Sequence, residues 1–342
     1  MFENKKPMWY ITEKLSLRCM MMIASLSVLF FSACNQPKTG ESEIPQAIIT
    51  NGQIEATLYL PDSINGYYRG ARFDWSGVIP ELTYQGHSYF GRWFPKYDPY
   101  IHDAIMGPVN DFYPLGYDEG KPGERFVKIG IGTFIKEEDK PYSFSRPAKL
   151  INPGKWKIAT KRDEVRFTHK LNDAEYSYKY SKIVRLEKDK PVMTLTHTLE
   201  NTGEKIIETN VYNHNFFVID QQPTGPDFII EFPFNLVGQF RRGADIAEFS
   251  GNQILIHQQL NPGQNIHGGN IAGFGETADD YNIRLENRKT GAGVRITCDR
   301  PLSNLVFWAA YSTLSAEPYT YIKVNPGEEF SWTITYQFYT TD

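Results

Sequence analysis

Short segments in which apolar and polar residues alternate recur along this chain and constrain its fold more than any other feature. Large apolar residues take every second position in Trp332–Phe338. Val165–Leu171 and Met193–Leu199 alternate in the same way, with His169 and His197 each at one of the apolar positions. A period of two places successive side chains on opposite faces of a half-buried strand. Beyond the N-terminal segment, no window of about fifteen residues follows the helical period. The pattern therefore predicts a chain built of strands.

Turn residues separate these segments and suggest how they assemble. Further strands are expected in ranges rich in aromatic and β-branched residues: Ala47–Leu60, Tyr67–Trp75, Tyr176–Leu186, Ile206–Ile219, Tyr281–Asn287 and Gly291–Cys298. Clusters of Asn, Pro, Thr and Gly lie between them. Many strands without alternating helices predict an all-β fold, a large antiparallel β-sandwich. No linker or repeat divides residues 47–342, which we expect to form one domain.

Two longer segments do not follow the strand pattern. Gly91–Gly123 and Gly251–Asp280 are rich in glycine and polar residues, and the first also in aromatic ones. Ordered loops of this length are often functional. Either segment could therefore wall a cleft.

The N-terminus carries the features of an export signal. Basic residues up to Arg18 precede the apolar run Met20–Phe31, which is too short to span a bilayer. Small residues then lead to Cys34, in a pattern that resembles a bacterial lipobox. The resemblance implies a signal peptide over residues 1–33, a tether over 34–46 and a lipid anchor at Cys34. The protein would then lie at the bacterial cell envelope, on the periplasmic or outer-membrane face; an ordinary signal peptide or a buried helix are the alternatives.

Composition excludes several classes of function. The 36 basic and 40 acidic residues leave a net charge of −4, so no basic surface for nucleic acid is expected. Cys298 would be the single cysteine of the folded domain and is expected to be a buried thiol, so neither a disulfide framework nor a cysteine metal site can form. The seven histidines show no metal-site spacing. We expect no metal and no cofactor.

Two clusters contain residues suited to acid–base chemistry. His214 follows Asn213 and precedes two phenylalanines, and Glu317 precedes a proline between two predicted strands. A carboxylate can accept a proton and an imidazole can donate one near neutral pH. Taken alone, Glu317 could equally be an exposed loop residue and His214 a structural one.

Together, these clusters resemble the C-terminal half of the aldose 1-epimerase (galactose mutarotase-like) family. The resemblance implies the large β-sandwich of that family, with Glu317 at a strand end as general base and His214 as the acid that protonates the ring oxygen. Asn213 would contact the substrate, and the neighbouring Tyr212 could stack on a sugar face or belong to the core. The implied reaction interconverts sugar anomers by ring opening on a mono- or oligosaccharide, with no metal or cofactor. His214 and Glu317 should therefore converge on one concave face.

The N-terminal half departs from the family pattern at two positions. Asp111 follows Asn110 where the family has an arginine, and Lys128 stands where it has a histidine. Arg72, His102 and Lys128 are the candidates to replace these groups in substrate binding. Such a cluster of cations would suit an anionic sugar, although each could be an ordinary solvated or ion-paired residue.

Three classes of function remain open from the sequence. The first is an aldose 1-epimerase-like enzyme at the cell envelope. The second is a noncatalytic carbohydrate-binding lipoprotein of a glycan-utilisation system, which keeps the cleft but not turnover. The third, a polysaccharide lyase or hydrolase, is least favoured because no well-placed pair of glycosidase carboxylates is found. Nothing in the sequence indicates an oligomeric state.

Overall fold

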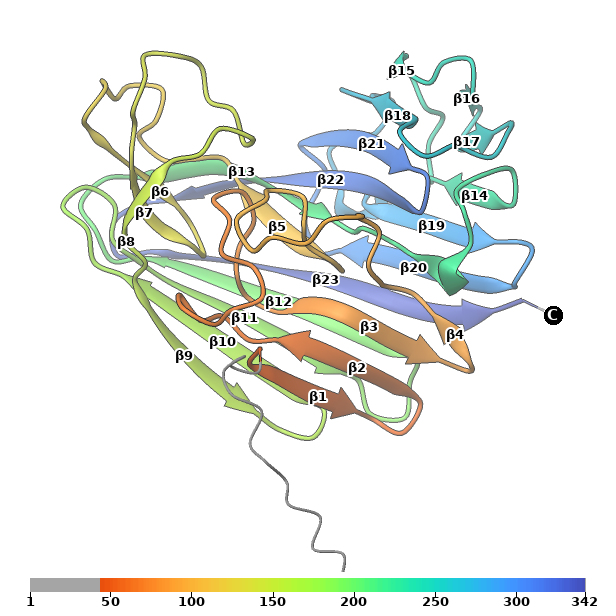
Figure 1. Cartoon of the computed structure of the whole chain (residues 1–342), viewed down its shortest axis with the longest axis horizontal. Helices are drawn as coiled ribbons and strands as arrows, with labels where there is room; N and C mark the ends of the chain where they lie inside the picture. Colours follow the sequence, from red (N-terminus) through yellow and green to blue (C-terminus); the bar gives the residue numbers. More distant parts are fainter. Residues whose placement is uncertain (1–43, 342) are drawn as a thin grey trace, which may run out of the picture. The chain divides into compact units, whose positions relative to one another are not determined.

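Antiparallel strands dominate residues 44–341, the part of the chain described by this computed structural model (Figure 1). The expected signal peptide over 1–33, Cys34 and the tether up to residue 43 lie outside the described residues. Gln46, assigned to the tether, already belongs to the first strand. No helix among the described residues is long and apolar enough to cross a bilayer.

The largest sheet has ten strands in the order β16–β17–β14–β19–β20–β23–β12–β11–β10–β9. Each strand pairs antiparallel with its neighbours. The strands are β9 (Lys155–Thr160), β10 (Glu164–Leu171), β11 (Tyr178–Leu186), β12 (Val192–Asn201), β14 (Phe228–Glu231), β16 (Ala247–Ser250), β17 (Gln253–Ile256), β19 (Asn282–Asn287), β20 (Ala292–Cys298) and β23 (Glu329–Thr340).

A six-stranded sheet packs against the inner face of the ten-stranded one and completes the sandwich. Its order is β15–β18–β21–β22–β13–β5. The strands are β5 (Val109–Phe112), β13 (Ile207–His214), β15 (Phe240–Arg242), β18 (Asn265–Gly268), β21 (Asn304–Ala310) and β22 (Thr313–Val324). Polar groups link the two layers: the Tyr336 hydroxyl of β23 donates to the Asn213 side-chain oxygen at 2.6 Å.

Two smaller sheets and two short helices complete the regular secondary structure of the described residues. One sheet joins β1 (Gln46–Thr50), β2 (Ile54–Tyr59), β3 (Val78–Tyr84) and β4 (His87–Ser88), and the other joins β6 (Arg125–Lys128), β7 (Gly132–Ile135) and β8 (Lys149–Asn152). The helices are the 3₁₀ turns η1 (Ile219–Gln221) and η2 (Ala278–Asp280).

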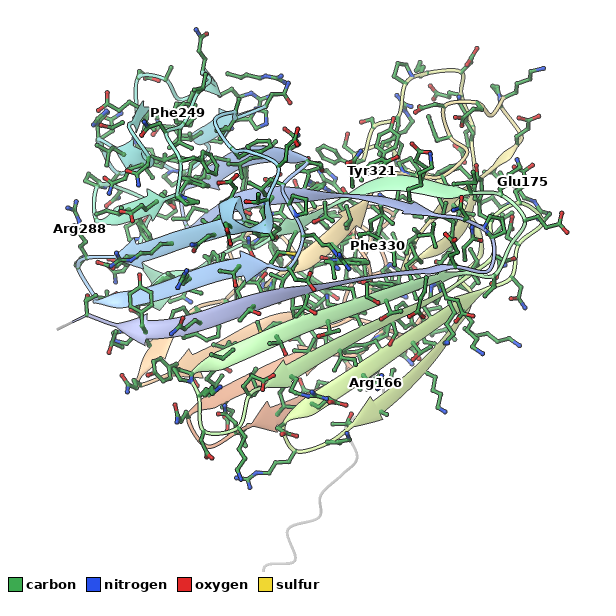
Figure 2. All side chains as sticks on the ribbon, turned by 180° about the vertical axis from the view of Figure 1, so that it is seen from behind. Arg166, Glu175, Phe249, Arg288, Tyr321 and Phe330 are labelled. Atoms are coloured by element: carbon green, nitrogen blue, oxygen red, sulfur yellow. The ribbon has the colours of Figure 1, made fainter. Side chains whose placement is uncertain are left out.

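The alternating sequence pattern maps onto the two faces of the large sheet. In β10, Val165 and Phe167 are buried in the core, whereas Arg166 between them is exposed on the outer face (Figure 2). The predicted all-β antiparallel sandwich is thus confirmed. It arises because each strand buries one apolar face against the facing layer.

Some predicted segments differ from the structure. Tyr67–Trp75 forms no strand. Its aromatic side chains are nonetheless buried in a second core cluster beside the main one, so this stretch is apolar because of packing and not because of sheet pairing. Ala47–Leu60 is a hairpin and not a single strand. Gly251–Asp280, predicted to be irregular, contains β17 and β18.

Candidate active site

A cavity of about 700 Å³ lies on the face of the six-stranded sheet that points away from the ten-stranded sheet. Strand alternation selects the residues of its floor, because every second side chain faces the cavity. Its floor is formed by Tyr212 and His214 of β13, Glu317 and Tyr319 of β22, and Val306 and Trp308 of β21. Tyr142 and Phe144, in the loop between β7 and β8, form part of one wall.

His214 and Glu317 meet in this cavity. The His214 Nε2 atom lies 3.2 Å from a Glu317 carboxylate oxygen, and the two residues are only 3% and 6% exposed. Glu317 does not stand at a strand end, as the sequence suggested, but inside β22, opposite Val306. The His214 ring stacks on Phe216 at a centroid distance of 3.6 Å, which fixes its plane.

Burial shifts the two pKa values in opposite directions. It raises the pKa of Glu317 to about 8; the negative charges of Asp111 and Asp103 add to this, and Arg72 opposes it. Burial also holds the pKa of His214 well below its ordinary value, and the charge of Arg72 lowers it further. Near neutral pH, the pair therefore holds one proton, which resides on the carboxyl group.

A network centred on Asp111, which itself lines the cavity, holds the cavity walls together. The Asp111 carboxylate accepts hydrogen bonds from the Tyr212 hydroxyl at 2.9 Å and from Arg72 Nε at 3.3 Å, and it is also ion-paired with Lys128. Arg72 donates to the Tyr212 hydroxyl at 2.7 Å and forms a second ion pair with Asp103. Tyr212 and Arg72 are thereby held beside the His214–Glu317 pair.

The structure brings some of the predicted substrate-binding residues to the cavity and not others. Arg72 and Tyr212 line it. Asn213 does not, because it alternates with His214 and points into the core, where it bonds to Asn110 and Tyr336. This placement corrects the prediction that Asn213 contacts the substrate.

Lys128 and His102 also lie outside the cavity lining. Lys128 is 1% exposed, and its ammonium group is occupied by Asp111, the Phe112 carbonyl and, at 3.2 Å, the Tyr142 hydroxyl. It supports the cavity floor and is not free to contact a sugar. His102 Nε2 lies 3.2 Å from Asp103, so this histidine can act on the cavity only through that carboxylate.

Several cavity residues were missed from the sequence. Tyr319 could have been found, because it lies two positions after Glu317 on the same strand face. Asn210 of β13 and Asn304 of β21 lie on the cavity faces of their strands and were also missed. Further missed residues come from a loop or from the strands β15 and β18: Asp103, Arg241, Arg242 and His267. In residues 44–341 no group of three or more His, Cys, Asp or Glu side chains could hold a metal ion.

Comparison with known proteins places this fold. No family model and no curated protein matches the sequence. Among solved structures, a galactose mutarotase-like protein from Clostridium acetobutylicum aligns with a TM-score of 0.55 at 13% identity, covering 88% of this chain and 97% of that one. A putative aldose 1-epimerase from Escherichia coli aligns with a TM-score of 0.52 at 15% identity, covering 87% and 100%.

An aldose epimerase homologue from C. elegans gives a similar result, with a TM-score of 0.53 at 14% identity over 87% of this chain and 100% of that one. At such low identity, the similarity shows the fold alone. The chain therefore has the galactose mutarotase-like sandwich that the sequence resemblance implied.

The supporting role of Lys128 can be tested by measuring stability. Lys128→Met keeps the aliphatic stem but leaves the buried Asp111 carboxylate without its cationic partner on that side. Removing one member of a buried ion pair typically costs about 3–5 kcal/mol of unfolding free energy. We expect a loss of that size in urea denaturation.

Lys179→Met is the matched control, because Lys179 pairs with Glu200 at 2.8 Å on the exposed surface of the same protein. Exposed pairs contribute less than about 1 kcal/mol, so this variant should stay close to the wild type. Equal stability of the two variants would show that Lys128 does not hold the cavity floor.

Proposed function

We propose that this protein is an aldose 1-epimerase-like enzyme that interconverts sugar anomers with His214 and Glu317 as its acid–base pair. The observation that carries the proposal is the direct contact of these two side chains inside a large cavity. A neighbouring indole, Trp308, offers an apolar surface for a sugar face, and the side chains of Asn210, Asn304 and Tyr319 offer hydrogen-bonding groups for hydroxyls.

The geometry of a cyclic sugar fits an acid and a base that touch each other. Ring opening removes the proton of the anomeric hydroxyl O1 and adds a proton to the ring oxygen O5. Both oxygens are bonded to C1 and are therefore close neighbours. A single pair 3.2 Å apart can serve both oxygens without moving the sugar.

The proton count of the pair also fits this cycle. The resting proton moves from Glu317 to His214 along their contact, which leaves a carboxylate and an imidazolium. Glu317 then takes the O1 proton while His214 protonates O5, the C1–O5 bond breaks and an aldehyde forms. The pair is again a carboxylic acid and a neutral imidazole, the state needed to close the ring on either face of C1 by the reverse transfers.

Arg72 and Tyr212 would position the substrate. They would also keep the electric field at His214 and Glu317 constant. Both are buried and tied to Asp111, so their orientation is fixed before a ligand arrives. Preorganised groups of this kind stabilise developing charge without reorganising during the reaction. Arg72 would face O1, which becomes negatively charged as it loses its proton.

Replacement of either member of the pair tests the mechanism. Glu317→Gln keeps the shape of the side chain but cannot accept a proton, and His214→Asn cannot deliver one. Loss of a general acid or base typically costs about 10²–10⁴-fold in rate. We expect enzymatic anomer exchange, measured by NMR on a panel of neutral and acidic sugars, to fall by that factor in each variant.

The matched control is Glu200→Gln, an exposed carboxylate of β12 that lies outside the cavity lining. It should keep wild-type exchange. If the wild-type protein binds sugars but shows no exchange above the uncatalysed rate, the enzymatic proposal fails and the noncatalytic carbohydrate-binding function replaces it.

The pH dependence follows from the single shared proton. The plot of kcat/KM against pH reports the ionisation of the free enzyme. Burial raises the pKa of Glu317 to about 8 and lowers that of His214, so the pair keeps one proton across neutral pH. We expect kcat/KM to be flat near neutrality and to fall above about pH 8 as that proton is lost. A rate that rises through pH 8 would show instead that the deprotonated pair is active.

We also propose that the protein is a lipid-anchored member of the bacterial cell envelope, supported by the lipobox-like sequence around Cys34. Cys34→Ser removes the acceptor thiol. The variant should move from the membrane to the soluble fraction when cells are fractionated and blotted. Membrane association that persists would mean that the apolar run Met20–Phe31 itself remains as an anchor.

A further inference from the structure

Two arginines at one end of the cavity have no ion-pair partner in the part of the chain that the structure describes. Arg241 and Arg242 of β15 line the same cavity as Glu317, and both are exposed. Among residues 44–341, neither guanidinium takes part in an ion pair or side-chain hydrogen bond. Arg72, in contrast, is paired with two aspartates. The unpaired guanidinium groups therefore leave positive charge at this end of the cavity that an anionic ligand could neutralise.

A β-bulge brings these neighbouring side chains to one cavity. In β15, Phe240 pairs with Gly268 and Arg242 with His267, which leaves Arg241 as the extra residue. Consecutive side chains of a regular strand point to opposite faces, whereas a bulge re-aims one of them. Phe240 is held against Phe249 with ring centroids 4.3 Å apart, so the start of the bulge is fixed.

Arg241 lies close to the Gly269 backbone, and both arginines lie close to His267. A Cβ added at Gly269 would come within 3.1 Å of the Arg241 guanidinium carbon, so this side chain lies close to the glycine backbone. The pKa of His267 is lowered, first by burial and then by the charges of Arg241 and Arg242. Three basic side chains thus converge at one end of the cavity.

The sheet order sets the distance from this end to the acid–base pair. β15 lies three strands from β22, in the order β15–β18–β21–β22, which corresponds to about 14 Å at the usual strand spacing. An extended arginine side chain covers only about half of that span, so the ligand has to bridge the rest. The sugar residue next to the one whose C1 lies at Glu317 can place an anionic group there.

We propose that Arg241 and Arg242 form a subsite for the carboxylate, sulfate or phosphate of the second residue of an oligosaccharide. The reducing-end sugar of that oligosaccharide lies at His214 and Glu317, so the inference rests on the proposed function for the placement of this first sugar. The substrate is then an acidic glycan fragment with a free reducing end. Bidentate recognition by a guanidinium suits all three oxyanions.

Calorimetric titration with matched disaccharides tests the subsite independently of turnover. The probes are cellobiose, cellobiose with glucuronate as its second residue, cellobiose with a sulfate ester or a phosphate ester on that residue, and free glucuronate. Charge-assisted hydrogen bonds typically strengthen binding by about tenfold to a hundredfold. We expect the wild type to bind at least one acidic disaccharide more tightly than cellobiose by that factor at low salt. Free glucuronate should bind no more tightly than cellobiose.

The double variant Arg241→Ala/Arg242→Ala should bring the ratio of acidic to neutral affinity close to one. Arg241→Lys/Arg242→Lys should restore part of it, and Arg166→Ala on the outer face of the large sheet should leave it unchanged (Figure 2). An affinity ratio near one in the wild type overturns the subsite, and so does a preference that survives the double alanine variant. Because binding is measured apart from exchange, loss of the subsite and loss of the enzymatic function give different results.

Discussion

The buried carboxylate of Asp111 is the group on which the cavity depends. It joins three separate segments: Tyr212 on β13, Arg72 in the loop before β3, and Lys128 at the end of β6. A buried charge is costly unless it is paired, so each partner is held firmly once the fold has formed. The pairing fixes the floor of the cavity and sets the electric field around His214 before any ligand enters.

Burial makes a single chemical unit out of His214 and Glu317. Water would favour a carboxylate beside an imidazolium, whereas the desolvated cavity favours the neutral form of both groups. The energy difference between the two arrangements of the proton is therefore set by the protein and can change when the hydroxyl groups of a ligand enter the cavity. The stack of His214 on Phe216 contributes to this desolvation and also restricts the ring to one plane.

The sequence predicted those parts of the molecule that depend on local pattern. β10, β12 and β23 each bury one face, so their alternation is visible, whereas Tyr67–Trp75 is rich in aromatic residues because it packs in a core and was mistaken for a strand. Alternation alone would have shown that Asn213 and His214 face opposite layers.

Other features of the cavity depend on long-range contacts or local irregularities. His214 and Glu317 lie about a hundred positions apart and meet through the pairing of β13 with β22, which the family resemblance anticipated and periodicity could not. The burial of Lys128 depends on which segments cover it, and the convergence of Arg241 and Arg242 depends on a bulge. Neither the burial nor the convergence can be recognised from composition or residue spacing.

The position of β23 in the large sheet bears on how this chain folds. It lies between β12 and β20 in the sheet. It is therefore the strand that joins β9–β12 on one side to β14, β16, β17, β19 and β20 on the other. Because Glu329–Thr340 follows all these strands in the sequence, the two halves of the sheet share no backbone ladder until β23 has been made and is in place. Closure of the large sheet therefore depends on contacts distant in sequence, a topology associated with slow folding. Ribosome-bound chains that lack this strand would expose the edges of β12 and β20 side by side, as two open templates for pairing with other chains.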